Sequence, residues 1–249
     1  MIEIRDLEKA LGGKPVLRGV SLRVADGETM AVIGGSGAGK SVLLKHVIGL
    51  LRPDAGEVWV DGERVADLDR DGLVRLRARM GYVFQGAALF DSMTVAENIA
   101  MGRVASDGRP VARPADRDEV AHCLSLVNLE PEVMDLMPAE LSGGMRKRVG
   151  LARAVASPRK YLLYDEPTTG LDPVTSDVIN HLICDLDVRL GVTAVVVTHD
   201  MKTVAATADR VALLHEGVIR WTGTPDEMSR AQDPVVRGFL EGRADLAAV

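Results

Sequence analysis

Aromatic residues are scarce in this 249-residue chain, where Phe, Trp and Tyr together make up 3% of a composition that is 47% hydrophobic. Its core must therefore be packed mainly from aliphatic side chains and methionine, and the chain is long enough to bury a substantial core within one compound domain. The sequence also lacks a run of eighteen apolar residues and an amino-terminal signal pattern. These two absences argue against a membrane-spanning or secreted protein and predict a soluble protein of the cytoplasm.

Cysteine is also rare. Cys123 and Cys184 lie outside any metal-binding spacing, so we interpret both as buried or inert residues of a reducing compartment. The net charge of −6 argues against extended nucleic-acid binding. The basic residues Arg75, Arg77 and Arg79 fall in a predicted helix, and a solvated helix face accounts for them.

A glycine-rich segment follows a short apolar run of β type over residues 29–33 and precedes a helix-like run over residues 42–48. It fits the pattern G-x-x-x-x-G-K-[ST], in which glycines let successive backbone amides approach phosphate oxygens. We expect Lys40 to reach the terminal phosphates and the Ser41 hydroxyl to ligate Mg²⁺. The predicted phosphate-binding residues are Gly34, Gly35, Ser36, Gly37, Ala38, Gly39, Lys40 and Ser41.

Two adjacent acids end a second apolar run, over residues 161–164. We expect Asp165 to hold Mg²⁺ through a water molecule and Glu166 to act as the general base that polarises the attacking water. Because neighbouring side chains on a strand point to opposite faces, the pair is not expected to share one proton.

A third motif, Leu-Ser-Gly-Gly-Met, occupies residues 141–145. Ser142 is a typical N-cap residue, Gly143 and Gly144 leave backbone amides open, and residues 145–155 continue as a helix. A helix start with open amides is a second anion site. One chain therefore carries two phosphate-binding surfaces, and a head-to-tail dimer would close both around two ATP molecules.

The remaining pattern predicts an α/β fold. Turn signals at Asp26-Gly27, Asp61-Gly62 and Glu216-Gly217 separate strand-like runs, whereas residues 86–157 have a helical pattern with a polar break at 106–110. The predicted strands cover residues 2–5, 16–24, 29–33, 57–60, 80–85, 161–165, 193–198, 210–215 and 218–222.

Together these segments resemble the ATP-binding-cassette ATPases, from about Ile2 to Gly223. The resemblance implies a RecA-like P-loop NTPase core with an antiparallel β subdomain and an inserted α-helical subdomain. We expect the ATPase domain at residues 1–225, with its core at about 1–85 and 158–225 and its helical subdomain at about 86–157. A carboxy-terminal helical extension is expected at 226–249.

The same resemblance implies roles for particular residues. It places Gln85 at the Mg²⁺ and the attacking water, and His199 at the γ-phosphate, so the predicted catalytic residues are Glu166, His199 and Gln85. The loop over residues 169–172 is expected to cross the dimer interface. The ATP-binding set is thereby extended by Ser142, Gly143, Gly144 and Asp172, and the predicted Mg²⁺ ligands are Ser41, Gln85 and Asp165.

The sequence departs from the family pattern at two positions. Leu11 stands where an aromatic ring usually stacks on adenine, and what replaces that ring is left open. Met145 ends the Leu-Ser-Gly-Gly motif where Gln is commoner, which removes a side-chain amide but leaves the backbone donors.

Three short segments resemble the lipid-asymmetry, or toluene-tolerance, transporters of the Mla type, which work with membrane-bound Mce proteins. They are the Leu-Ser-Gly-Gly motif ending in Met145, residues 84–98 and residues 233–242. This resemblance implies a homodimer that powers lipid transport from the inner face of the cell membrane. Its implied partners are an integral permease, an Mce-type substrate-binding protein and a small regulatory subunit.

Several alternatives stay open. Leu89, Phe90, Met93 and Val95 fit either a permease contact or the core of the helical subdomain. A tail stripe packs either on a partner or on the chain's own core, and consists of Val235, Val236, Phe239 and Leu240. The rival functions are a polar-solute importer for amino acids or ions, a non-transport cassette ATPase, and a catalytically inactive regulatory module.

Overall fold

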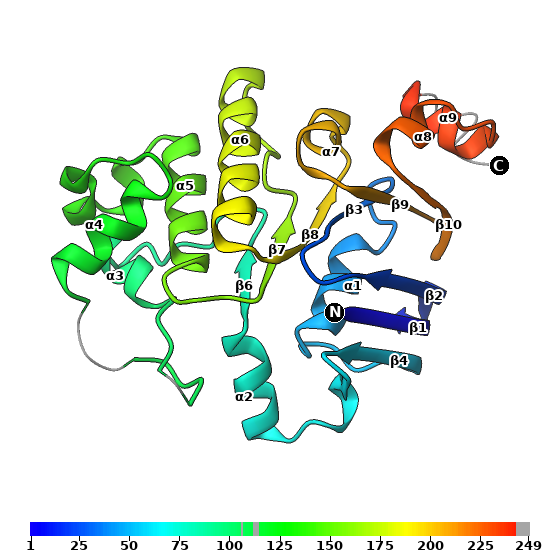
Figure 1. The fold of residues 1–249 in the computed structure, drawn as a ribbon, viewed down its shortest axis with the longest axis horizontal. Helices are drawn as coiled ribbons and strands as arrows, with labels where there is room; N and C mark the ends of the chain where they lie inside the picture. The colour runs from blue at the N-terminus through cyan, green and yellow to red at the C-terminus, as the bar shows by residue number, and fades with distance from the viewer. Residues whose placement is uncertain (106, 112–114, 243–249) are drawn as a thin grey trace. The chain divides into compact units, whose positions relative to one another are not determined.

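The computed structural model describes residues 1–105, 107–111 and 115–242 (Figure 1). The chain divides into two compact units, one formed by residues 1–69 and the chain from Thr193 onward, the other by residues 70–192. The predicted division at about residues 85, 157 and 225 stays a prediction, and residues 106, 112–114 and 243–249 of the expected subdomain and extension lie outside the described part. Within that part, none of the helices has both the length and the apolar character of a membrane span.

The first unit contains an antiparallel sheet in the order β2-β1-β4-β5. Its strands are β1 (Ile2–Leu11), β2 (Lys14–Val24), β4 (Ala55–Val60) and β5 (Glu63–Arg64). Ile2 pairs with Val24 on one side and with Val60 on the other, and all three side chains are buried. The β4–β5 turn has positive φ at both Asp61 and Gly62, the geometry of the tight hairpin turn predicted there.

A second group of strands in this unit follows the order β10-β9-β3-β8. Its members are β3 (Thr29–Ile33), β8 (Thr193–Thr198), β9 (Arg210–His215) and β10 (Val218–Gly223). β3 is parallel to both β8 and β9, and all of its residues are buried, as is typical of a central parallel strand. Ile33 pairs with Thr198, so β3 and β8 end level with one another, whereas β9 continues to His215, beyond the pairing of Ile33 with Leu213. Helices α1 (Lys40–Val47) and α7 (Met201–Thr207) follow two of these ends.

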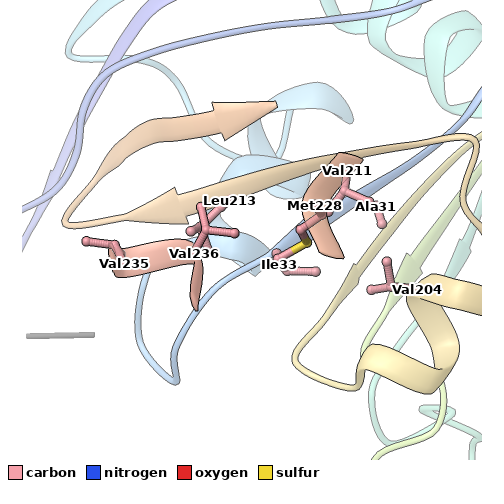
Figure 2. Close-up of a cluster of buried hydrophobic side chains, with 8 residues drawn as sticks. All are labelled: Ala31, Ile33, Val204, Val211, Leu213, Met228, Val235 and Val236. Carbon is pink, nitrogen blue, oxygen red and sulfur yellow. The ribbon is translucent and has the colours of Figure 1, made fainter. Parts of the chain in front are cut away.

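The carboxy-terminal helices α8 (Pro225–Ser229) and α9 (Pro234–Leu240) pack on the core of the first unit. Figure 2 shows Met228 from α8 and Val236 from α9 in one buried cluster with Leu213 of β9. Two further tail residues, Phe239 and Leu240, pack against this cluster and are partly buried. Of the two alternatives for the tail stripe, the structure therefore shows packing on the chain's own core.

The second unit combines two parallel strands with a block of helices. Val83 at the end of β6 pairs with Tyr164 near the end of β7, and Tyr164 is fully buried. The elements are β6 (Met80–Val83), β7 (Tyr161–Asp165), α2 (Arg70–Ala78), α3 (Val95–Ala100), α4 (Arg117–Ser125), α5 (Gly143–Ala154) and α6 (Pro173–Leu190), with 3₁₀ turns at Pro131–Asp135 and Pro138–Glu140. The predicted α/β class, with parallel strands, an antiparallel sheet and a helical block, is confirmed.

Several strand boundaries differ from the prediction: β1 runs to Leu11 and not to residue 5, β2 begins at Lys14 and not at residue 16, and β4 begins at Ala55 and not at residue 57. The strand expected to run to Gln85 ends at Val83. The backbone turns at once, because the Ala87 amide donates to the Phe84 carbonyl over 2.9 Å and both Ala87 and Ala88 have positive φ. Gln85 therefore lies in a loop.

We expect Val236→Ala to lower the free energy of unfolding by about 2 kcal/mol, because it removes two buried carbon atoms and leaves a cavity. Val236 is 0% exposed, whereas Val188 on α6 is 82% exposed and provides the matched control. Val188→Ala should change stability by less than about 0.5 kcal/mol. Urea unfolding measures both, and equal effects of the two substitutions would contradict the packing of α9.

Candidate functional site

The predicted phosphate loop connects β3 to α1 in the first unit. Gly37 and Gly39 have positive φ, of 79° and 104°. A β-carbon at Gly39 would lie 2.9 Å from Leu17 Cδ2, so the loop packs too closely on β2 for a larger residue. The glycines are therefore required by geometry, and they leave the loop backbone accessible to a phosphate.

Lys40, the first residue of α1, is 7% exposed. Its Nζ donates to the Gly34 carbonyl over 2.8 Å and to the Gly35 carbonyl over 3.2 Å. The ammonium group thus lies inside the curve of the loop, and the first turn of α1 contains no acidic residue. A cation, a helix start and backbone amides at one point form a site that fits a phosphate chain.

His199 lies at the same edge of the parallel strands as the phosphate loop. Because Ile33 pairs with Thr198, Gly34 and His199 are the first residues beyond two adjacent strand ends. The next residue, Asp200, is fixed by hydrogen bonds: its amide donates to Thr198 Oγ1 over 3.0 Å, its Oδ1 accepts from the Lys202 amide over 2.9 Å, and its Oδ2 accepts from Thr203 Oγ1 over 3.0 Å. His199 is exposed, and its contact with the γ-phosphate stays a prediction.

Gln85 lies just after β6, and Asp165 and Glu166 lie at and just beyond the end of β7, in the second unit. Asp165 is the last residue of β7, whereas Glu166 has a φ of 49° and lies beyond the strand in the left-handed region. The expectation that both acids lie on one strand is therefore wrong, and strand alternation does not set the directions of their side chains. Glu166 Oε2 accepts a hydrogen bond from Thr169 Oγ1 over 3.1 Å, which orients the carboxylate.

Ser142 is the N-cap of α5, as predicted: its Oγ accepts a hydrogen bond from the Met145 amide over 3.2 Å. Ser142 and Gly143 are exposed. A β-carbon at Gly144 would lie 2.6 Å from Thr175 Cγ2, so the start of α5 packs closely against the start of α6. This close approach requires glycine and leaves the exposed corner of α5 available to a ligand.

Asp172, at the end of the 169–172 loop, caps α6. Its Oδ1 accepts from the amides of Val174 and Thr175, both over 3.0 Å. Hydrogen bonds from Thr175 lower the pKa of Asp172 below its ordinary value. The predicted interface loop and the Leu-Ser-Gly-Gly motif thus lie side by side in the second unit, and their contacts with ATP stay predictions.

The sequence reasoning missed two cations of α5. The Lys147 ammonium donates to the Gln85 carbonyl and, over 3.4 Å, to the Glu166 carbonyl. Arg153 donates to the carbonyls of Ala87 and, over 2.6 Å, Ala88. One helix therefore holds the loop that contains Gln85 and the backbone of the predicted general base.

A signal for Lys147 was present in the sequence. Burial lowers the pKa of Lys147, while the charges of Glu166 and Asp165 oppose that shift. Lys147 shares a helical stripe with Gly150, Leu151 and Ala154, all of which are buried. A lysine on an apolar stripe indicates a buried cation with specific acceptors.

The residues present also fit a nucleotide-bound Mg²⁺. Among the described residues, no three His, Cys, Asp or Glu side chains are grouped so as to hold a metal ion. Such a group is not needed, because Mg²⁺ in these sites is held by one or two carboxylates together with substrate phosphates and water. Ser41, Gln85 and Asp165 supply oxygen donors of the type that Mg²⁺ prefers.

A phosphate loop between a parallel strand and a helix, with a carboxylate pair after another parallel strand, is the arrangement of a P-loop ATPase. The family model described as ABC transporter matches residues 17–169. The chain belongs to the ABC transporter family and is an ATPase that binds ATP together with Mg²⁺.

Two relatives are similar to the chain over nearly its whole length. The chain is 40% identical to Protein TRIGALACTOSYLDIACYLGLYCEROL 3, chloroplastic, of Arabidopsis thaliana, over 98% of this chain and 74% of that protein. It is 44% identical to the methionine import ATP-binding protein MetN of Caulobacter vibrioides, over 100% of this chain and 75% of that protein.

Two solved structures share the fold. The ATP-binding cassette MJ0796, a dimer in a post-hydrolysis state with ADP and Pi, matches with a TM-score of 0.77 and 31% identity over 90% of this chain and 99% of that one. The protein cbiO1 of Clostridium perfringens, part of the transporter complex cbiONQ, matches with a TM-score of 0.79 and 28% identity over 99% of this chain and 97% of that one.

We expect Lys147→Met to lower kcat about tenfold while leaving the affinity for ATP unchanged, because the carbonyls of Gln85 and Glu166 lose a charged donor. Arg148→Met is the matched control on the same helix, since the Arg148 guanidinium donates to the Asn128 carbonyl over 2.8 Å and not to the catalytic loops. Steady-state ATPase kinetics and nucleotide titration measure the two quantities. An unchanged kcat in the Lys147 variant would show that the bridge is not needed for hydrolysis.

Proposed function

We propose that this chain is the ATP-hydrolysing subunit of a lipid transporter and that it works as a homodimer bound to an integral permease. The observation that carries the ATPase mechanism is the presence of two helix starts suited to anions, at α1 and α5. They belong to different units of the chain. The dimeric state of the cassette MJ0796 supports a head-to-tail pair in which each nucleotide meets α1 of one copy and α5 of the other.

In this mechanism, the phosphate loop and Lys40 hold the phosphate chain and neutralise part of its charge. Glu166 accepts the proton of the attacking water, and His199 orients the γ-phosphate. The water oxygen forms a bond to the γ-phosphorus, the bond to the bridging oxygen of ADP breaks, and the products are ADP and inorganic phosphate. Mg²⁺, when bound by Ser41, Gln85 and Asp165, stabilises the negative charge of the transferred phosphoryl group.

The corner of Ser142 and Gly144 completes the site from the partner copy. Its open amides attract the γ-phosphate, so ATP joins the two copies and its hydrolysis removes the charge that joined them. The exposed position of Ser142 supports this role.

The loop after Gln85 is the proposed permease contact. Within this loop Phe90 is 48% exposed, and Phe84, just before Gln85, is 40% exposed, whereas Val95 is fully buried. Asn98 fixes the loop, since its Oδ1 accepts from the Phe90 amide over 2.7 Å and its Nδ2 donates to the Phe90 carbonyl over 3.1 Å. Exposed rings on a fixed loop favour docking, while Val95 belongs to the core. Leu89 and Met93 are half-buried.

The lipid assignment is supported by the Leu-Ser-Gly-Gly-Met motif, by residues 84–98 and 233–242, and by the Arabidopsis relative, whose name is that of a galactolipid. An Mce-type protein and a small regulatory subunit are proposed as further partners, on the inner face of the cell membrane. Methionine import is the second candidate, because MetN of Caulobacter vibrioides is as similar to the chain.

We expect Glu166→Gln to lower kcat at least about 100-fold while ATP binding is retained, because the amide accepts protons poorly. The variant should form an ATP-dependent dimer, which size-exclusion chromatography with and without ATP detects. Lys40→Ala is the control and should neither bind ATP nor dimerise. Normal turnover by the Glu166 variant would rule out its assignment as the general base.

The cargo is tested with the permease complex. We expect the tagged ATPase, purified from membranes in mild detergent, to bring down a permease and an Mce-type protein with bound phospholipid, identified by mass spectrometry. In liposomes, the ATPase rate of that complex should not respond to millimolar methionine. A methionine-stimulated rate, or co-purification of a methionine-binding protein, would replace the lipid assignment with the importer.

A further inference from the structure

Tyr82 lies on β6, next to the predicted Mg²⁺ carboxylate on β7. The Tyr82 hydroxyl donates to Asp165 Oδ2 over 2.9 Å. Both residues belong to the second unit, and Tyr82 pairs with Leu163 in the register of the two strands. The bond therefore connects two parallel strands through side chains at the edge where the catalytic loops begin.

The Tyr82 side chain is held in one position. Its ring packs on Phe84, with ring centroids 4.4 Å apart at an interplanar angle of 43°. The phenol O–H is the donor and the carboxylate oxygen can only accept, so the hydrogen bond has a single direction.

We propose that Tyr82 is a positioning residue for Mg²⁺: by fixing Oδ2 of Asp165, its hydroxyl sets the rotation of the carboxylate and so the direction of Oδ1. This inference rests on the proposed role of Asp165 in the Mg²⁺ site. Carboxylates that serve metals are themselves commonly held by hydrogen bonds, and removal of such a bond typically costs 10–100-fold in metal affinity or activity. Asp165 is 7% exposed, so bulk water cannot readily replace the phenol.

A second tyrosine gives a matched control. Tyr164, on β7, donates its hydroxyl to Asp187 Oδ1 over 2.7 Å, and both residues are buried. It forms the same chemical bond on the neighbouring strand, but with a carboxylate that belongs to α6 and has no predicted role toward nucleotide. Tyr164→Phe therefore reports the cost of losing a buried hydroxyl while the hydrogen bond from Tyr82 to Asp165 stays in place.

The test measures binding of a non-hydrolysable ATP analogue by calorimetry in excess EDTA and over a series of Mg²⁺ concentrations. The full-length wild type, Tyr82→Phe, Tyr164→Phe and Asp165→Asn are compared. We expect Tyr82→Phe to bind the analogue normally in EDTA and to need about tenfold more Mg²⁺ for half of the Mg²⁺-dependent gain in affinity. Tyr164→Phe should keep the wild-type Mg²⁺ dependence, although its melting temperature falls.

The outcomes separate this inference from the proposed function. If Asp165→Asn loses the Mg²⁺-dependent gain but Tyr82→Phe keeps it, the role of Tyr82 is overturned and that of Asp165 stands. If both tyrosine variants shift the Mg²⁺ dependence equally, the effect is a general loss of packing and the inference fails. If Asp165→Asn keeps the full gain, the proposed Mg²⁺ role of Asp165 fails, and the role of Tyr82 with it.

Discussion

The register of the parallel strands determines which loops of the site lie next to each other. In the first unit, the pairing of Ile33 with Thr198 makes Gly34 and His199 neighbours in register. In the second, the pairing of Val83 with Tyr164 does the same for the Gln85 loop and the Asp165–Glu166 pair. Parallel strands present their carboxyl ends at one edge, so residues far apart in the chain become neighbours without any direct bond between them.

Helix α5 has 12 residues, and its first turn and its body play different parts in the site. Its start supplies an N-cap and close-packed glycines, whereas its body supplies the buried Lys147 and the partly buried Arg153. A buried lysine is costly unless its donors are used. Here they are used on main-chain carbonyls of Gln85 and Glu166, so burial of the charge also orders two loops. The hydrogen bonds that offset the burial of the Lys147 ammonium therefore also fix the positions of the Gln85 and Glu166 carbonyls.

The sequence alone locates the motif residues and most of the strands, because both follow from local patterns. Glycines before Lys40 and an apolar run before Asp165 can be recognised within ten residues. Three features could not be recognised in this way. The left-handed φ of Glu166 depends on the turn beyond β7, the bond from Tyr82 to Asp165 crosses two strands, and the acceptors of Lys147 are main-chain atoms far away in sequence.

The tail stripe illustrates a different limit. Residues 235, 236, 239 and 240 predict an amphipathic helix, but an apolar stripe does not say which surface covers it. Val211 and Leu213 of β9 and Met228 of α8 form that surface. The periodicity of α9 predicts the apolar stripe but does not identify β9 and α8 as the elements that cover it.

The loops that follow β6 and β7 contain strained backbone. Glu166, Ala87 and Ala88 all have positive φ, a conformation that residues with a β-carbon adopt at a cost. Lys147 donates to the carbonyls of Gln85 and Glu166, and Arg153 donates to those of Ala87 and Ala88. Side chains of α5 therefore stabilise the strained backbone of both loops. Lys147 lies five residues beyond the cap Ser142, which is about 7.5 Å along the axis at a rise of about 1.5 Å per residue.

A short, rigid segment of α5 therefore separates the corner proposed to meet the partner's nucleotide from the cations that hold the hydrolytic loops. The segment between Ser142 and Lys147 is hydrogen-bonded helix, so a phosphate that displaced the corner would be expected to move Lys147 with it. Lys147 contacts the carbonyls of Gln85 and Glu166, so such a movement would reach the backbone of the proposed general base. The helix proposed to meet the partner's nucleotide is thus also the helix that contacts the loop of Glu166.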